Sequence, residues 1–384
     1  MSDHNIFIKM TPRDLLFCRD AKPMESSWDG CGGFLPAPST LFGAILSQMH
    51  NKMSQEESLK IASSLSTAGP FLCKDNEIYF PTPLDIIPGN KLLELKLPAG
   101  SSDLPQPLKY ALFAGKPSKE TVKPYISFSE FKKYLAGESF KLPQESDFFD
   151  REVRPGITIN AKTRTAEDSK FYVAEYLRLR EDEKVTLAAR ITLTDHEKLS
   201  HIFPADESVL MQLGGQQTMV YAERATVDFI PDAHITGKFV KWVLLTPAAW
   251  NKGWLPEFVD EASSEWNILL KACDGPKVER RPGEYRAAYR KRLAASNKPI
   301  AAKLIAARVG KPLAISGWKN QGSGGGSARA THLYVPAGAV YYFEAQDENE
   351  AQKLVKALHG RCLSTFGGRA GFGLGVCGNF TINE

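Results

Sequence analysis

The histidines, cysteines and carboxylates are the residue types most able to do chemistry, and their spacing defines no active site. None of the seven histidines stands in a compact motif with serine or cysteine, so a nucleophile would lack its base. The six cysteines form no CxxC pair, which argues against a zinc site, and no DxD or HD pair suggests two metals. We therefore expect no metal, no cofactor and no catalytic residue.

Residues 154–180 suggest a different chemistry, the binding of a polyanion. Apolar Ile157 and Ile159 alternate with polar neighbours, a polar run follows, and a second alternating segment begins near Phe171. This pattern predicts a long β-hairpin, basic at its base and tip. Its mixture of basic, amide, hydroxyl and aromatic groups suits a phosphate backbone and unstacked bases, although a polar face that meets water would give the same pattern. The candidate contacts are Arg154, Thr158, Asn160, Lys162, Thr163, Arg164 and Tyr172.

Two glycine-rich stretches could bring backbone amides close to a phosphate. Residues 366–376 contain GxGxG, but they follow a predicted helix and precede a strand, so they are not a dinucleotide fingerprint. Glycines at this density still permit close approach of a phosphate, with Arg369 beside them. The pair Gly214–Gly215 permits either a ligand's approach or a simple tight turn.

Positive charge is concentrated locally rather than spread over the chain. The net charge is only +4, but residues 277–311 hold eleven basic residues against two acidic ones. Such a run is often a solvated face, yet this imbalance favours an acidic partner, and nucleic acid first.

Length and composition indicate a two-domain soluble protein. The 384 residues, 43% hydrophobic and 24% charged, suffice for two separate cores. The strand that runs into Thr246-Pro247 echoes the one that runs into Thr11-Pro12, which suggests two related halves with a boundary near 230–238. Scattered cysteines, no secretory signal and no apolar run of membrane-spanning length predict a cytoplasmic protein.

The elements that must position these groups are predicted from periodicity. Ser39 is the expected N-cap of the first helix, where exposed amides could hold an anion. Residues 81–124 are proline-rich and indicate irregular surface used for docking, and 322–327 form a flexible GSGGGS loop. Strands are expected over 6–10, 15–17, 77–81, 185–194 and 239–246, and 331–344 is expected to form two strands joined by a turn at 336–338. Helices are expected over 38–49, 55–65, 127–135, 257–272 and 348–359.

Six strings in this order resemble one protein family over the whole chain. They are TPRDLLFCRD, PSTLFGAI, RPGITINAKTRTAEDSKFYVAEYL, LGG, SGW with VPAGAVYYFE, and GFGLG. The family is the third subunit of the Cmr, or type III-B, CRISPR effector complex, of the RAMP superfamily. It belongs to the group that holds the 5′ end of the guide RNA.

The resemblance implies an α+β fold of two ferredoxin-like (RRM-like) domains with antiparallel sheets. Residues 1–236 would form the first domain, with the hairpin at about 154–180 inserted as a thumb. Residues 237–384 would form the second, with the basic segment 277–311 and the glycine-rich loop 366–376. The implied role is non-catalytic. Such a subunit grips the 5′ repeat-derived tag of the CRISPR RNA, meets target RNA near the tag, caps the backbone RAMP filament and binds the large polymerase-like subunit.

By analogy with the family, the tag site would be lined by three segments. They are the TPRD segment, the start of the first helix and the C-terminal glycine loop, with Gly214 and Gly215 as a further contact. Gln216 and Gln217 stand where relatives more often carry charge, and the 81–124 and 322–327 segments look like additions. The implied residues are Arg13, Arg19, Ser39, Thr40, Gly214, Gly215, Gln216, Arg369, Gly371, Gly373 and Gly375.

Two alternatives stay open at this point. One is a RAMP-type endonuclease that processes CRISPR repeat RNA with a histidine such as His4, which lies near the opening strand and could serve an acid–base pair; a surface histidine is the plainer explanation. The other is a protein-only docking subunit whose basic window faces an acidic neighbour.

Overall fold

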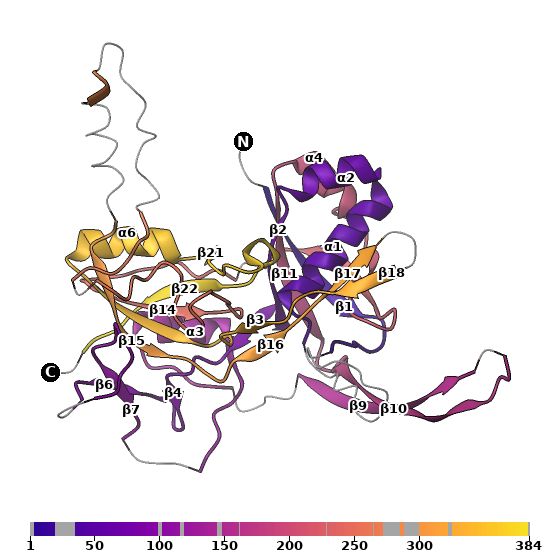
Figure 1. Cartoon of the computed structure of the whole chain (residues 1–384), viewed down its shortest axis with the longest axis horizontal. Coiled ribbons are helices and arrows are strands. Elements are labelled where there is room, and N and C mark those ends of the chain that lie inside the picture. The colour runs from indigo at the N-terminus through magenta and orange to yellow at the C-terminus, as the bar shows by residue number, and fades with distance from the viewer. Residues whose placement is uncertain are drawn as a thin grey trace.

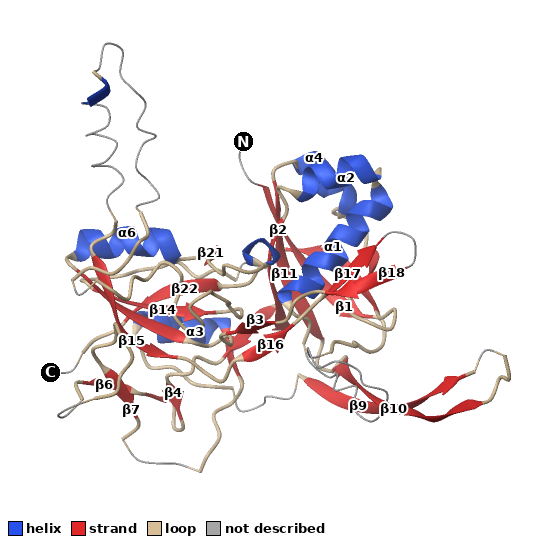
Figure 2. Ribbon diagram, viewed as in Figure 1, coloured by secondary structure: helices blue, strands red, loops and turns tan. Residues whose placement is uncertain are grey.

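The chain folds into a mixed α and β structure built on antiparallel sheets (Figure 2). A computed structural model describes residues 4–19, 35–98, 102–115, 119–143, 148–160, 162–227, 229–263, 265–271, 285–287, 299–321 and 325–382. The expected combination of helices and antiparallel strands is thus confirmed. Within these ranges no helix combines the length and apolar character needed to cross a bilayer.

The first sheet has seven strands in the order β12-β13-β1-β11-β2-β3-β8. Alternation in β1 buries Ile6, Ile8 and Met10 on one face, where three helices pack against the sheet (Figure 1). The strands are β1 (His4–Pro12), β2 (Ser66–Lys74), β3 (Glu77–Pro81), β8 (Tyr125–Ser127), β11 (Val185–Leu193), β12 (Val209–Gln212) and β13 (Met219–Ala225). The helices are α1 (Pro38–Lys52), α2 (Gln55–Ala62) and α4 (His196–Ile202).

The second sheet has five strands in the order β15-β20-β14-β22-β21. Helix α6 (Glu348–Leu358) covers one face, and Asp347 caps it by accepting from the Glu350 N–H at 2.9 Å. Helix α3 (Phe128–Ala136) packs on the other face. The strands are β14 (Phe239–Leu244), β15 (Ala302–Arg308), β20 (Val340–Ala345), β21 (Arg361–Cys362) and β22 (Leu374–Asn379).

A third hydrophobic cluster lies between the sheets and joins them. It contains Phe71 and Phe80 from the first sheet, Val243 and Tyr342 from the second, and Phe229 from the connection. Phe229 packs edge-on against Phe71 at 5.0 Å between ring centroids. The two sheets therefore share a core.

A buried polar network runs through this shared core. Lys241 on β14 donates from Nζ to the Tyr134 carbonyl at 2.8 Å and lies 3.5 Å from the Tyr134 ring centroid. The hydroxyls of Tyr134 and Tyr342 donate to Asp85 at 2.9 and 2.6 Å. Burial lowers the pKa of Lys241 to about 8, against the opposing charge of Asp85. The network ties α3 and the segment after β3 to the second sheet.

Short two-stranded sheets lie outside the two large sheets. In the 81–124 region, the N–H groups of Lys109 and Tyr110 donate to the Ile305 carbonyl on β15, so the region lies against the second sheet. The ribbons there are β4 (Ile86–Ile87) with β5 (Lys91–Leu92) and β6 (Glu94–Lys96) with β7 (Ala111–Phe113). Two others are β16 (Leu313–Ile315) with β19 (His332–Tyr334) and β17 (Trp318–Gln321) with β18 (Gly325–Ala328).

Four expectations about elements are wrong. Residues 325–327, expected in a flexible loop, belong to strand β18 and pair with β17, and residues 322–324 lie outside the described ranges. Helix α1 begins at Pro38, and its N-cap is Ala37 rather than Ser39, because proline needs no N–H at the first helical position. Residues 15–17 form only an isolated bridge, Leu16 to Leu177. Residues 257–263 and 265–271 contain no helix, because Asn267 instead bonds to β15, its side-chain oxygen accepting from the Leu304 N–H at 2.9 Å. Residue 272 lies outside the described ranges.

Candidate nucleic-acid interface

The expected hairpin is present, and it projects from the body of the molecule (Figure 1). Strands β9 (Phe149–Ile159) and β10 (Ala166–Leu179) pair from Phe149 opposite Leu179 out to Ala166 opposite Ile159. It starts five residues before the expected position, at 149 rather than 154. Leu177 and Leu179 are buried in the first core and anchor the base.

Ion pairs neutralise the base of the hairpin. Arg178 donates to Glu152 at 2.8 Å and to Asp14 at 3.1 Å, and Arg154 reaches Glu152 at 2.7 Å. The hydrogen bonds from Arg178 and then Arg154 lower the pKa of Glu152 below its usual value, so this carboxylate stays charged. The expectation of a basic base is therefore wrong, because its arginines face acidic partners.

The tip of the hairpin is a fixed turn with exposed cations. The Asn160 side-chain oxygen accepts from the N–H groups of Lys162 and Thr163 at 2.9 and 3.2 Å. The Arg164 N–H donates to the Asn160 carbonyl at 2.8 Å, and Arg164 adopts φ = 56°. Lys162 and Arg164 are exposed and form no ion pair with any residue that the structure describes. The tip thus offers two cations on a preformed turn.

The 11–19 segment and the Gly214–Gly215 turn lie against the hairpin base. The Gly215 N–H donates to the Phe17 carbonyl at 2.8 Å, and a Cβ on Gly214 would lie 2.6 Å from that oxygen. The Phe17 ring packs on Tyr176 of β10 at 5.0 Å between centroids. The glycine pair is thus needed for close approach of the protein's own backbone.

The structure brings together four of the expected contacts around this base. Arg13 is exposed, and its backbone N–H donates to the Met219 carbonyl at 2.9 Å. It therefore lies next to the first residue of β13. Arg19 and Gln216 are also exposed. With Arg154 they form a group of polar side chains from three separate segments.

The start of α1 and the glycine-rich loop form a second group. Ala37 packs in one apolar cluster with Ala370 and Phe372 of the loop, which places Ser39 and Thr40 beside it. Arg369, in the 3₁₀ turn η1 (Gly368–Ala370), donates from Nε to the Leu65 carbonyl at 3.3 Å and also to the Ala62 carbonyl. Its guanidinium therefore binds carbonyls at the C-terminal end of α2.

Three glycines of the loop, Gly371, Gly373 and Gly375, are buried and serve internal packing. A Cβ on Gly371 would lie 2.8 Å from the Thr67 carbonyl oxygen, and Gly371 itself accepts from the Thr246 hydroxyl at 2.7 Å. Gly373 turns at φ = 74° against Ser364, and Gly375 lies under the Trp242 ring. These three positions offer little surface to a phosphate, so we leave them out of the interface.

Some expected contacts cannot be placed by their side chains. The backbones of Thr158 and Tyr172 belong to the hairpin, but their side chains are not among those that the structure describes. Of the basic segment 277–311, only 285–287 and 299–311 are described. Sequence reasoning expected ion pairing in the TPRD segment but missed the ion pairs that Asp14 and Glu152 form with Arg178. The register that sets Glu152 opposite Tyr176, between the arginines, is what would have revealed them.

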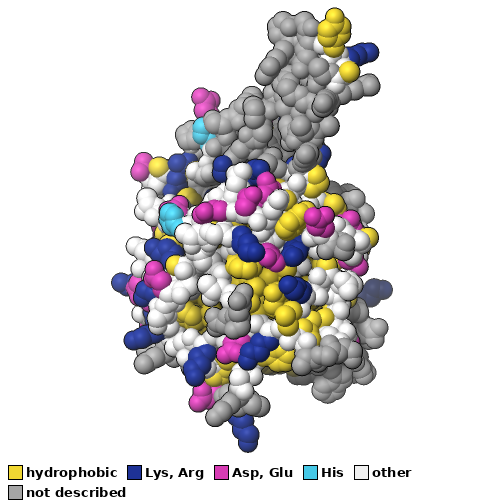
Figure 3. All heavy atoms as spheres, turned by 90° about the vertical axis from the view of Figure 1, so that its left-hand side faces the viewer, with side chains coloured by type: hydrophobic (Ala, Val, Ile, Leu, Met, Phe, Trp, Pro, Cys, Tyr) yellow, Lys and Arg dark blue, Asp and Glu magenta, His cyan; other side chains and the backbone are white. Residues whose placement is uncertain are grey.

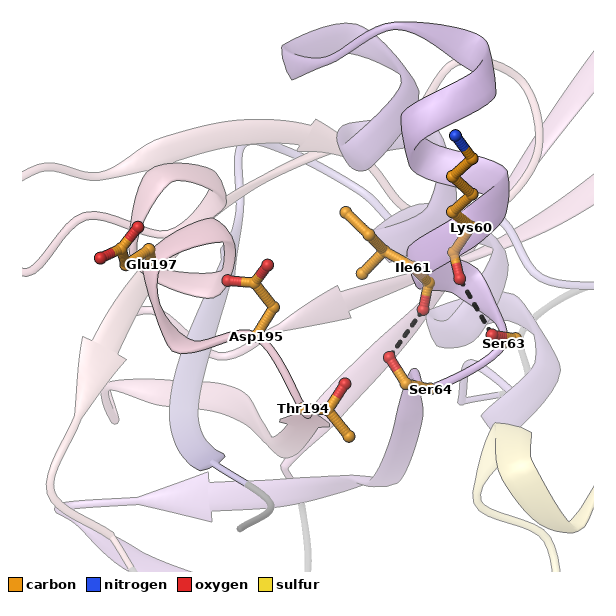
Figure 4. A pocket seen from close by; sticks show the side chains of 7 residues that line it. All are labelled: Lys60, Ile61, Ser63, Ser64, Thr194, Asp195 and Glu197. Atoms are coloured by element: carbon orange, nitrogen blue, oxygen red, sulfur yellow. Dashed lines mark hydrogen bonds between the residues drawn. The ribbon is translucent and has the colours of Figure 1, made fainter. Parts of the chain in front are cut away.

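One surface pocket in the first domain region holds no catalytic arrangement. It measures about 450 Å³ and lies between α2 and α4, with Asp195 and Glu197 on one side and the serines on the other (Figure 4). Ser63 and Ser64 donate to the carbonyls of Lys60 and Ile61 at 2.9 Å, so neither hydroxyl meets a base. Two carboxylates would repel a phosphate.

The face shown in Figure 3 carries charges of both signs, and the described residues hold no cluster of metal ligands. Within the described ranges no three His, Cys, Asp or Glu side chains gather as metal ligands. The side of β6, β7 and β15 shows hydrophobic side chains among lysines, arginines and acids of mixed sign (Figure 3). His4 begins β1 opposite Leu193. The hairpin remains the described feature best suited to a polyanion.

Comparison with known families decides the assignment. The family described as "CRISPR-associated protein (Cas_Cmr3)" matches residues 8–380, nearly the whole chain. The chain belongs to this family. Membership in the Cas_Cmr3 family confirms the resemblance drawn from the six sequence strings, and with it a place among the subunits of type III CRISPR effectors. No curated protein matches the chain.

Distant likenesses among solved structures accompany this family match. One is a chain in a cryo-EM structure of the Type III-B Cmr-beta bound to cognate target RNA. It shows 15% identity and a TM-score of 0.46, with 88% of this chain and 86% of that chain covered. Another is a chain in a crystal structure of a Csm3-Csm4 subcomplex in the type III-A CRISPR-Cas interference complex, at 10% identity and a TM-score of 0.39, with 89% and 97% covered.

Proposed function

We propose that this Cas_Cmr3 member is a non-catalytic subunit that binds the 5′ tag of the CRISPR RNA. In this proposal it caps the backbone RAMP filament and joins it to the large polymerase-like subunit in antiviral defence. The hairpin acts as a thumb that meets the guide and the target RNA near the tag. The proposal rests on family membership and on the hairpin's geometry.

Strand order supports two ferredoxin-like domains. In the first sheet, β13-β1-β11-β2 are neighbours, with α1 and α2 between β1 and β2 and α4 between β11 and β13. In the second, β22-β14-β20-β15 are neighbours, with α6 between β20 and β22. Both orders fit a βαββαβ plan, although the described residues between β14 and β15 supply no long helix. We place the domains at 1–236 and 237–384.

The single observation that carries the RNA role is the hairpin tip. Lys162 and Arg164 are exposed cations on a turn that Asn160 holds, while the base below them is charge-balanced. Cations without an acidic partner at the tip of a projecting hairpin attract a polyanion. The arginines at the hairpin base already form ion pairs with carboxylates. Positioning, with no bond made or broken, is the chemistry that this arrangement supports.

Replacing both tip cations tests the thumb. In the assembled complex, Lys162→Ala/Arg164→Ala should weaken guide retention and change the spacing of target cleavage next to the tag. A matched variant, Lys52→Ala/Lys91→Ala, removes two exposed lysines elsewhere and should leave both measurements unchanged. Unaltered guide retention and cleavage spacing in the tip variant would overturn the thumb assignment.

A second experiment tests the absence of catalysis. Purified chain incubated with labelled repeat RNA, without metal, should give no discrete product. A product that is lost in His4→Ala would favour the processing endonuclease instead.

A further inference from the structure

Two aromatic rings from distant parts of the chain stack at the molecular surface. His332 of β19 and Phe366, at the start of the glycine-rich loop, lie 4.1 Å apart between ring centroids with an interplanar angle of 23°. Both rings remain partly exposed. Directly beside them, Tyr334 and Phe372 from the same two segments pack at 4.6 Å. We call the His332–Phe366 pair the aromatic ledge.

The ledge is held rigidly from below. Tyr334 and Phe372 are buried, and a Cβ on Gly367 would lie 2.7 Å from the Phe372 ring, so the loop closes tightly over it. The Phe366 carbonyl accepts from the Ser364 hydroxyl at 2.8 Å. Because the rings are already ordered, a flat ligand that stacks on them loses little conformational freedom of the protein.

The surroundings of the ledge suit a nucleotide. Arg329, three residues before His332, is exposed and forms no ion pair with any described residue, and its N–H is fixed on the Gly317 carbonyl at 2.8 Å. Phe366 and Ala37 belong to one apolar cluster, so the first turn of α1 borders the ledge. Glu257, which approaches Thr365, already accepts from Asn251 at 3.1 Å.

Stacking is the chemistry that this pair of rings offers. The partly exposed, nearly parallel pair of rings offers a flat π-system at the surface, and bases of single-stranded RNA stack on such rings whatever their sequence. A paired base inside a duplex could not present its face to the ledge.

We propose that the His332–Phe366 ledge receives one unpaired base of the bound guide RNA, with Arg329 at the rim for the adjoining phosphate. This inference rests on the proposed function, because it requires guide RNA to cross between the start of α1 and the glycine-rich loop. It adds a base-stacking site formed by residues that neither the sequence strings nor the hairpin identified.

Fluorescence of 2-aminopurine tests the ledge in the assembled complex. Guides that carry the probe at successive tag positions should show one position quenched by stacking in the wild-type complex. Phe366→Leu, which keeps an apolar side chain over Phe372, and His332→Ala should each restore fluorescence at that position. Each should weaken guide binding by on the order of 10-fold. Leu333→Ala is the control, because Leu333 is 64% exposed and points away from the ledge on the same strand.

The outcomes separate the ledge from the proposed function. If the wild-type complex holds the tag but the quenching at that one position persists in both variants, the ledge is wrong and the tag-binding role stands. If tagged and untagged guides bind the wild-type complex equally, the proposed function itself fails. Thermal unfolding of each variant shows whether it remains folded. If Phe366→Leu does not fold, the result for His332→Ala decides the test.

Discussion

The hairpin and the glycine-rich loop both contain residue types associated with phosphate binding, yet the fold uses them in opposite ways. On the hairpin, Lys162 and Arg164 stand exposed on a projecting ribbon, and the arginines nearer the base are paired with carboxylates. In the loop, Gly371 and Gly375 are buried against backbone and indole. Residue type alone therefore does not identify a phosphate site, and exposure and pairing decide which residues are available.

Gly375→Ala should have the largest effect and should act on folding. The added methyl would meet the buried Trp242 ring, including Cζ2 at 2.8 Å, inside the second sheet. We expect a loss of about 3 kcal/mol or more in the free energy of unfolding. Urea denaturation measures it. A variant as stable as the wild type would contradict the claim that the loop glycines serve packing while the hairpin serves binding.

Lys241→Met tests the scaffold that carries both regions. The folded-state pKa of Lys241, about 8, lies below its usual value, so the native state binds fewer protons than the unfolded state between about pH 8 and 10.5. Wild-type stability should therefore rise relative to the variant over that interval. Below pH 8 the buried charge costs up to about 3 kcal/mol, so the variant should be as stable or more stable at pH 7.

Urea unfolding of both proteins at pH 7 and pH 10 measures this difference. Tyr342→Phe, which removes a hydrogen bond to Asp85 but leaves the lysine, should not alter the pH dependence assigned to Lys241. An identical pH dependence for the wild type and Lys241→Met would contradict the depressed pKa.

The tip variant Lys162→Ala/Arg164→Ala should leave stability unchanged and lower the salt dependence of guide binding. Two lost phosphate contacts on single-stranded RNA reduce the slope of log K against log salt by about 1.4. Filter binding of the assembled complex over a salt series measures the slope. An unchanged slope would place the tip outside the RNA contact.

Arg178→Ala should have the smallest effect, and it sharpens the contrast between base and tip. The Arg178 side chain is 42% exposed and already engages Glu152 and Asp14, so its loss should cost less than about 1 kcal/mol of stability. The salt slope should change less than in the tip variant. A larger change in slope would mean that the base arginines leave their carboxylates to bind RNA.

Sequence reasoning predicted several of the regular elements, including the hairpin. Period-2 alternation located β1 and the hairpin, because each has one apolar face that packs or pairs. The helix expected over 257–272 failed because Asn267 satisfies strand backbone groups, a tertiary contact that no local pattern records. Ser39 failed as a cap because the helix already starts at Pro38, so that the N-cap is Ala37, two residues before Ser39.

The candidate site was harder to predict because it depends on which groups meet. Arg154 and Arg178 appear in the sequence as free cations, and only the strand register sets them around Glu152. The glycines of the loop correctly predicted that other atoms come close to the loop backbone. Those atoms belong to the protein itself and not to a phosphate. His332 and Phe366 are 34 positions apart, so their stacking could not be read from sequence spacing.

Photo-crosslinking from the guide RNA tests the central claim most directly. A guide with 4-thiouridine at the junction of tag and guide, assembled into the complex and irradiated, should crosslink to the hairpin tip at residues 160–165. Mass spectrometry of the adducts identifies the peptide, and the crosslink should fall in Lys162→Ala/Arg164→Ala but persist in Lys52→Ala/Lys91→Ala. Crosslinks confined to other subunits, with none on this chain, would contradict its role as the subunit that holds the tag.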